Sequence, residues 1–250
     1  ILKKVMVSKK VISDIISQYA LGGNVEKVKW TVSDDNLYIS FTNDSRTVAG
    51  EIKYTQNIGL KNGDYGIYDT SKLIKCLNIL DGEILLETKT TNGINSKLNI
   101  ADTSYEIKFN LADTSVIDPV DVTKIVVPEK YNATFDVSDE FITRFVKSKD
   151  ALNELPTFTA ETREGFTSDE ILFTVGTHIT NTIEFAVDAT VETPFTPIPF
   201  SSDLFKEILK SNRTYEKGTI KFYDMLITIE FEFENGLTSK YFLIRLQENN

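Results

Sequence analysis

The stretch YDTSKLIKCLNIL, residues 68–80, combines a polar cap with apolar residues that recur one helical turn later. The same pattern occurs three more times, as VMVSKKVISDIISQY (5–19), TFDVSDEFITRFVKSK (134–149) and PFSSDLFKEILKSN (199–212). The first apolar residues of the four patterns, Val11, Leu73, Phe141 and Leu204, follow one another at steps of 62, 68 and 63 residues. Apolar positions i, i+1, i+4 and i+5 lie on one side of a helix, so each copy predicts a helix with one buried face.

Each predicted helix starts after a residue that can cap its free N–H groups. The predicted caps are Ser8, Asp69 or Thr70, Ser138, and Ser201 or Ser202. The helices themselves are expected over residues 9–19, 71–80, 139–149 and 202–213.

A short apolar segment precedes every helix, and three strand-like segments follow it. The preceding segments are KKVMV, YGIYD, ATFDV and FTPIPF. The following ones are VKWTVS, NLYISF and TVAGEIKY; EILLETKT, SKLNIA and YEIKFNLA; FTAET, EILFTVG and TIEFAVD; TIKFYD, LITIEFEF and SKYFLIRL. Asn-Gly at 92–93 and at 235–236 is a strong hairpin signal between such strands. The pattern predicts an α+β fold of antiparallel sheets, in which a strand–helix–three-strand unit occurs four times.

Two such units per domain predict an N-terminal domain at 1–115 and a C-terminal domain at 131–250. The segment between them, 116–130, contains two prolines and no helical period, which is typical of an extended connector. Its residues Ile125, Val126 and Val127 are more apolar than a free linker requires, so we expect it to lie against a domain.

The strand LITIEFEF alternates between two kinds of side chain, which indicates one covered face and one face in water. The covered face is predicted to present Ile227, Ile229, Phe231 and Phe233. The wet face is predicted to present Thr228, Glu230, Glu232 and Glu234. The helices are expected to pack on the covered face.

Composition argues against most enzyme classes. The chain has 250 residues, 41% of them hydrophobic, one histidine and one cysteine. A lone histidine excludes multi-histidine metal sites, and His178 lies in a strand-like run where a structural or surface role is expected. Cys76 cannot form an internal disulfide, which fits a reducing cytosol, and its apolar neighbours predict a small buried residue. The sequence has no P-loop, GxSxG or GxGxxG motif, so we predict no catalytic residue, metal or cofactor.

Charge is unevenly distributed along the chain. The net charge is −10, which by itself argues against nucleic acid, yet the four predicted helices sum to +5 and the remainder to −15. Basic residues near helix ends can simply complement the helix dipole. Repetition in four equivalent helices of an acidic chain instead favours a shared basic surface.

The order of the units and this charge pattern resemble those of the DNA sliding clamps. The most specific match is to the clamp of T4-type bacteriophages, through IYDTSKLIKCLNILDGEILLET (67–88) and NGINSKLNIADTSYEIKFNLADTSVIDP (92–119). The closing segments GTIKFYDMLITIEF and SKYFLIRLQ resemble that family less closely.

The resemblance implies a ring of three subunits, with helices around duplex DNA and each subunit adding an edge strand to the next. Such a ring would tether a DNA polymerase as its processivity factor, would be placed by an ATP-dependent clamp loader, and would have no enzymatic activity. It implies a cytoplasmic protein, in the infected host cell if phage-encoded, with no membrane association. The implied DNA-facing residues are Lys9, Lys10, Lys72, Lys75, Arg144, Lys147, Lys149, Lys206, Lys210 and Arg213.

Clamp partners usually insert a short apolar peptide beside the connector. The resemblance places that pocket at Ile125, Val126, Val127, Pro128, Leu243 and Leu246. Leu243 and Leu246 are equally well explained as plain core residues. Three other interpretations stay open: a cellular-type clamp, a viral β-rich structural or carbohydrate-binding protein, and an enzyme. The β-rich protein offers no reason for four matched helices, and the enzyme lacks a catalytic constellation.

Overall fold

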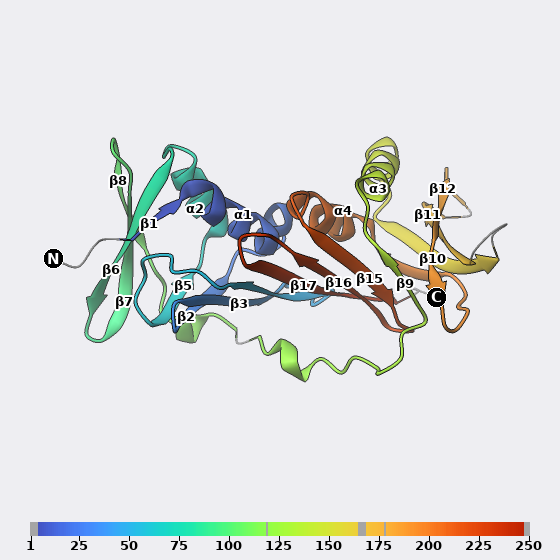
Figure 1. The fold of residues 1–250 in the computed structure, drawn as a ribbon, viewed down its shortest axis with the longest axis horizontal. Helices are drawn as coiled ribbons and strands as arrows, with labels where there is room; N and C mark the ends of the chain where they lie inside the picture. The colour runs from blue at the N-terminus through green and yellow to red at the C-terminus, as the bar shows by residue number, and fades with distance from the viewer. Residues whose placement is uncertain (1–4, 119, 165–168, 178, 248–250) are drawn as a thin grey trace. The chain divides into compact units, whose positions relative to one another are not determined.

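The computed structural model describes residues 5–118, 120–164, 169–177 and 179–247. His178 lies outside the described residues. Contacts between residues divide the chain into two compact units. Figure 1 shows the ribbon of the whole chain. Unit 1 comprises Ile1–Asp44, Gly50–Val122 and Asn235–Ser239, and unit 2 comprises Ser45–Ala49, Thr123–Glu234 and Lys240–Asn250.

The described residues form four α-helices, one at each predicted position. They are α1 (Lys9–Ala20), α2 (Thr70–Leu77), α3 (Asp139–Ala151) and α4 (Ser202–Ser211). Asp69, Ser138 and Ser201 each accept a hydrogen bond from a backbone N–H in the first turn, as an N-cap does. Ser8 occupies the same position before α1 without a side-chain bond. The predicted α+β class and the four helices are therefore confirmed, with ends that differ by a few residues.

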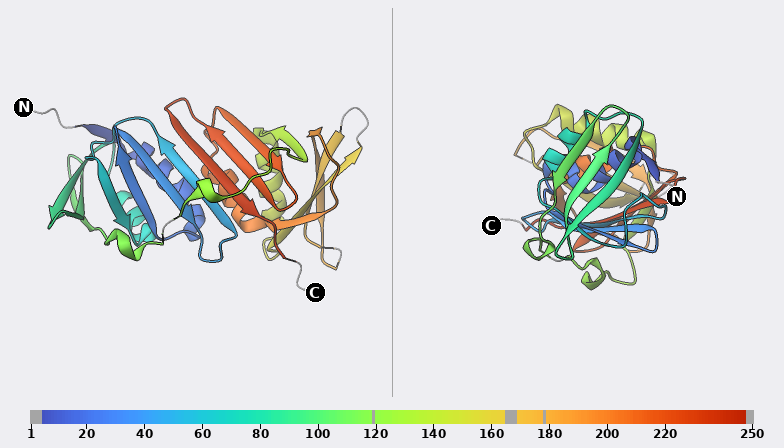
Figure 2. Two further views of the ribbon diagram at one scale, coloured as in Figure 1. Left: turned by 90° about the horizontal axis from the view of Figure 1, so that it is seen from below. Right: turned by 90° about the vertical axis from the view of Figure 1, so that its left-hand side faces the viewer.

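Unit 1 contains two antiparallel sheets. The strands of the first are β2 (Val28–Ser33), β3 (Asn36–Thr42), β4 (Val48–Tyr54, of which 50–54 fall in unit 1) and β5 (Gly63–Ile67), in the order β4-β3-β2-β5. The strands of the second are β1 (Met6–Ser8), β6 (Glu83–Thr91), β7 (Ile94–Ala101) and β8 (Glu106–Asn110), in the order β1-β6-β7-β8. The right panel of Figure 2 shows this second sheet in front.

Unit 2 repeats the plan. Its first sheet contains β13 (Thr190–Val191), β9 (Ala133–Asp136), β15 (Lys217–Phe222), β16 (Leu226–Glu232) and β17 (Leu237–Ile244, of which 240–244 fall in unit 2), in that order. Its second sheet has the order β12-β11-β10-β14, formed by β12 (Ile183–Asp188), β11 (Asp169–Val175), β10 (Thr157–Glu164) and β14 (Ile198–Ser201). All predicted strands are present, and β13 is the described strand that the sequence patterns missed.

The helices of each unit pack on one face of its sheets. In unit 1 the ring of Tyr19 on α1 lies 6.5 Å from that of Phe41 on β3, and both are buried. Trp30 on β2 faces the same core and is 1% exposed. The left panel of Figure 2 shows the strands of this unit in front of its helices. The opposite face of this sheet therefore has no α-helix of the described residues packed on it.

Phenylalanine rings fill the core of unit 2. The ring of Phe145 on α3 lies 4.6 Å from that of Phe205 on α4 and 5.0 Å from that of Phe158 on β10. The ring centre of Phe173 on β11 lies 5.1 Å from that of Phe141 on α3. The two pairs of Phe145 are edge-to-face, and such pairs stabilise a core beyond the area that they bury. The rings therefore fix the two helices against the sheet of β10 and β11.

One burial prediction was wrong and two were partly wrong. Thr228, predicted on the wet face, is 3% exposed because it is a short side chain in a strand flanked on both sides, opposite Lys221. Phe233 lies beyond the end of β16 and is only half-buried. Cys76, predicted to be buried, is half-buried because Leu73 and Leu77 form the buried face of α2 and Cys76 lies beside it.

Candidate nucleic-acid interface and partner surfaces

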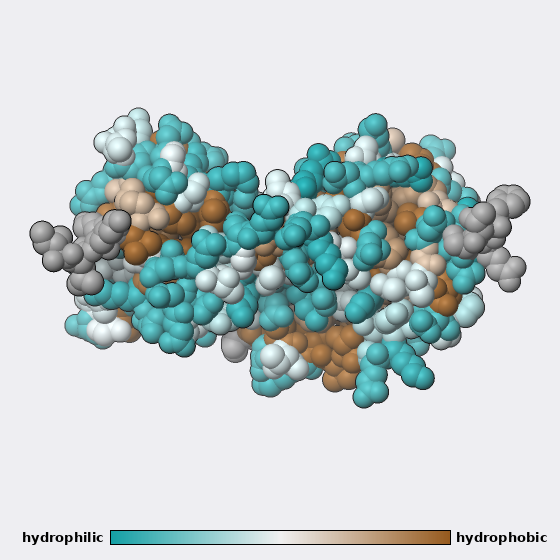
Figure 3. All heavy atoms as spheres, in the orientation of Figure 1, coloured by the Kyte–Doolittle hydropathy of each residue, from teal (hydrophilic) through white to brown (hydrophobic). Residues whose placement is uncertain are grey.

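The helices of unit 1 present lysines on the side away from the sheet. Lys10 is paired with Asp14 at 2.5 Å, and its side chain is 68% exposed. Lys72 and Lys75 on α2 are exposed, and within the described part of the chain neither forms an ion pair. The Lys9 ammonium donates to the carbonyl oxygen of Leu80, a neutral partner, and no carboxylate pairs with Lys9 among the described residues. Figure 3 shows mostly hydrophilic surface over α2.

In unit 2, two exposed cations of the helices and the half-buried Lys206 lie next to carboxylates. Arg144 pairs with Glu140 at 2.5 Å, and Lys210 pairs with Glu207 at 3.5 Å. The Lys206 ammonium bonds the carboxylate of Asp150, which directly follows the predicted end of α3. That hydrogen bond is the main reason why the pKa of Asp150 lies below its usual range, and the charges of nearby lysines contribute.

Two further cations were predicted on the helix surface of unit 2. Lys147 is exposed on α3 and forms no ion pair within the described residues. Arg213 was predicted to lie in the helix over 202–213, but α4 ends at Ser211 and Arg213 lies exposed in the following turn. The predicted helix therefore extended two residues too far.

Lys149 does not belong to the exposed set. It is 1% exposed, and its Nζ donates to the carbonyl oxygens of Asn153 at 2.6 Å and Leu155 at 2.9 Å. Asp203 on α4 lies 3.0 Å from the same nitrogen. The prediction that Lys149 faces DNA is withdrawn because this ammonium group is fully used in joining α3, the loop that follows it and α4.

The predicted partner pocket is divided between exposed and buried residues. Val126 is 87% exposed, Pro128 is exposed, and Ile125 and Val127 are half-buried. In Figure 3 a hydrophobic patch lies where the connector runs in Figure 1. Leu243, in contrast, is completely buried, so it is a core residue and is withdrawn from the pocket.

Leu246 is half-buried beyond β17, and its backbone N–H donates to the carbonyl oxygen of Pro199 at 2.9 Å. Its side chain thus stays a candidate for partner contact, together with the four connector residues.

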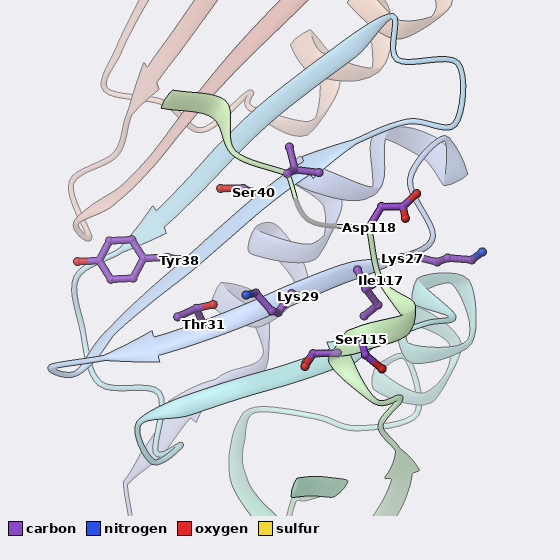
Figure 4. Close-up of a pocket in the computed structure, with 10 residues that line it drawn as sticks. Lys27, Lys29, Thr31, Tyr38, Ser40, Ser115, Ile117 and Asp118 are labelled. Carbon is purple, nitrogen blue, oxygen red and sulfur yellow. The ribbon is translucent and has the colours of Figure 1, made fainter. Parts of the chain in front are cut away.

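Sequence reasoning missed a pocket of about 530 Å³ in unit 1, shown in Figure 4. Its floor is the face of β2 and β3 opposite the α-helices, and its wall is formed by residues around the start of the predicted connector: Thr114, Ser115, Ile117, Asp118 and Val120. The side chains in it are Lys27, Lys29, Thr31, Tyr38, Ser40, Thr114, Ser115, Ile117, Asp118 and Val120. The available signal was the polar residue at every second position of VKWTVS. The mixed polar lining differs from the apolar pocket that the resemblance implies.

Metal clusters and membrane-spanning helices are two further features that the chain could carry. No cluster of His, Cys, Asp or Glu suited to a metal ion occurs among the described residues. Within that part of the chain, no helix has the length and apolar character needed to cross a membrane.

The two units together have the fold of the DNA sliding clamps, with helices on one face of antiparallel sheets. The proliferating cellular nuclear antigen of Entamoeba histolytica matches with a TM-score of 0.74 and 14% identity, over 97% of this chain and 97% of that one. The A. fulgidus PCNA, solved with the C-terminal region of FEN-1 bound, matches with a TM-score of 0.72 and 16% identity, over 98% and 99% of the two chains. No family model and no curated relative matches the sequence.

Proposed function

We propose that this protein is a sliding clamp, which encircles duplex DNA as a ring of three subunits and tethers the replicative DNA polymerase as its processivity factor. The observation that supports this most is the clamp fold, which extends over nearly the whole chain. The proposed role is that of a scaffold without catalysis or cofactor. The predicted domains at 1–115 and 131–250, joined by the connector 116–130, remain part of the proposal.

Duplex DNA would contact the exposed cations on the helices. Lysine and arginine contacts to phosphates position DNA without reading its sequence and weaken as salt increases. The proposed DNA-facing set is reduced by one residue, Lys149, from the set that the resemblance implied. It comprises Lys9, Lys10, Lys72, Lys75, Arg144, Lys147, Lys206, Lys210 and Arg213.

Ring closure would use strands at sheet edges. If one edge of each subunit pairs with a different edge of the next subunit, head to tail, the subunits can close into a ring. We assign β8 of one subunit and β12 of the next to this contact. Both lie at the edge of their four-stranded sheet, and β12 holds Ile183, Phe185 and Val187 only half-buried. The other edges of these sheets are β1, with three residues, and β14, whose Pro199 lacks an N–H donor.

Partner proteins would dock at the connector through a short apolar peptide. The exposure of Val126 supports this, as does the bound C-terminal region of FEN-1 in the A. fulgidus structure. The proposed partners are the polymerase and an ATP-dependent clamp loader. The resemblance of residues 66–119 to T4-type clamps supports a phage replication system, and thus the cytoplasm of an infected cell.

A threading experiment tests the function without a loader. The protein is mixed with linear duplex DNA carrying biotin at both ends, the ends are blocked with streptavidin, and retention is measured in high salt. A ring should be retained on blocked DNA and should slide off unblocked DNA. Equal retention in the two samples would contradict the proposal. Light scattering should give three times the 28.3 kDa of one chain.

A further inference from the structure

The helices of the two units differ in charge, although their sequences repeat one pattern. Within their observed bounds, α1 and α2 contain four lysines and one aspartate, a net charge of +3. The bounds of α3 and α4 contain five cations and five carboxylates, a net charge of zero. Two charges of this difference arise because α3 extends to include Asp150, whereas α4 ends before Arg213.

In unit 2, carboxylates also form ion pairs with most of the cations on the helices. Four of the five cations on α3 and α4 form an ion pair: Arg144 with Glu140, Lys149 with Asp203, Lys206 with Asp150 and Lys210 with Glu207. Lys147, the fifth, forms no ion pair among the described residues, and Asp139 offsets its charge only in the sum over the helix. On α1 and α2 one pair, Lys10 with Asp14, occurs among the described residues.

We infer that duplex DNA is held mainly by the helices of unit 1, through Lys72, Lys75 and Lys9, while those of unit 2 form a nearly neutral wall. This inference rests on the proposed function. A phosphate that approaches a paired cation must displace its carboxylate, which then stays close to the DNA and repels it. Exposed ion pairs are weak, so the carboxylate is easily displaced, but its repulsion of the phosphate remains. An unpaired lysine binds phosphate without this opposing term.

Lys72 and Lys75 suit this role because both are exposed on the short helix α2. They are three residues apart and therefore lie on the same side of the helix. Their neighbours Leu73 and Leu77 bury the other side. A phosphate backbone passing α2 thus meets two free ammonium groups on one turn.

The test compares two variants in the full-length protein. Lys72→Gln with Lys75→Gln removes two unpaired cations. The matched control, Glu140→Gln, Arg144→Gln, Glu207→Gln and Lys210→Gln, also removes two cations, together with the carboxylates that they pair. Binding of a fluorescein-labelled duplex is measured by anisotropy over a salt series, and circular dichroism melting checks both folds.

The unit 1 variant should lower the slope of log affinity against log salt by about two, because each lysine that binds a phosphate contributes about one to this slope. The control removes Arg144 and Lys210, two members of the proposed DNA-facing set to which the inference gives a minor share of the binding, so it should lower the slope by less than about one. Equal decreases in the two variants, or a larger decrease in the control, would overturn the inference while leaving the clamp function intact. If wild-type protein also failed to be retained on end-blocked duplex, the proposed function would fall, and the inference with it.

Discussion

The ammonium group of Lys149 is surrounded by three oxygens, two from the loop after α3 and one from Asp203 on α4. A buried cation is costly unless it is hydrogen-bonded, and here each bond also joins two segments of unit 2. The role of this lysine is therefore structural, although its spacing along α3 resembles that of a surface cation.

Replacing Lys149 by methionine should reduce the free energy of unfolding by about 1.5–3 kcal/mol, the decrease typical of removing a hydrogen bond to a charged group. Urea unfolding followed by circular dichroism measures this decrease. The salt dependence of duplex binding should not change. An unchanged stability together with a lower salt slope would return Lys149 to the DNA-facing set.

The sequence predicted which residues are basic but not which of them are available. Lys149 and Lys147 have the same charge and lie two positions apart, yet one is buried and the other exposed. What decides between them is the path of the chain after α3, which brings the carbonyls of Asn153 and Leu155 to Lys149. No local pattern encodes that path. The ion pair of Lys206 with Asp150 was missed because it depends on how α3 packs on α4.

Elements were easier to predict than contacts, because strand alternation and helical period are local. The segments before and after each helix all became strands, whereas β13, with two residues, is too short for a period to be visible. Helix ends were less accurate. The two-residue extension of α3 and the early end of α4 changed the net charge of the helix layer from the expected +5 to +3.

The hairpin of β7 and β8 contains a carboxylate that holds its turn. Asp102 accepts hydrogen bonds from the backbone N–H groups of Ser104 and Tyr105 at 2.7 Å, and from that of Asp81 at 2.9 Å. These bonds favour the charged form and lower the pKa of Asp102 from 3.8. Such a carboxyl group stabilises the folded state at pH values above the pKa that it has in the unfolded chain. The stabilisation is lost as the pH falls through the lower pKa that the group has in the folded state.

Wild-type protein should therefore melt at a higher temperature than Asp102→Asn at neutral pH, and the difference should close as pH falls below 3.8. Thermal melting over a pH series measures it. Glu129→Gln, on the exposed connector, serves as the control for the general effect of removing a carboxylate. A difference that stays constant through the acid range would show that the charge of Asp102 is not what matters.

For the whole molecule, the decisive property is assembly. Placing a charge at the proposed subunit contact should break the ring, because a buried carboxylate without a partner is strongly disfavoured. Val187→Asp on β12 should convert the proposed trimer to a monomer in light scattering, while the circular dichroism spectrum stays unchanged. Val126→Asp, the same change on the connector, should leave the mass unchanged and weaken polymerase stimulation. A trimer that tolerates Val187→Asp would exclude β12 from the interface.

The buried indole of Trp30 gives the chain a built-in optical label. It is the single tryptophan of the sequence and lies in the core of unit 1, whereas the core of unit 2 is built around phenylalanine rings. Emission excited selectively through tryptophan therefore records the melting of unit 1 alone, and circular dichroism records both units. Comparing the two signals would reveal whether the halves of the chain lose their structure together or in turn, without any dye or added mutation.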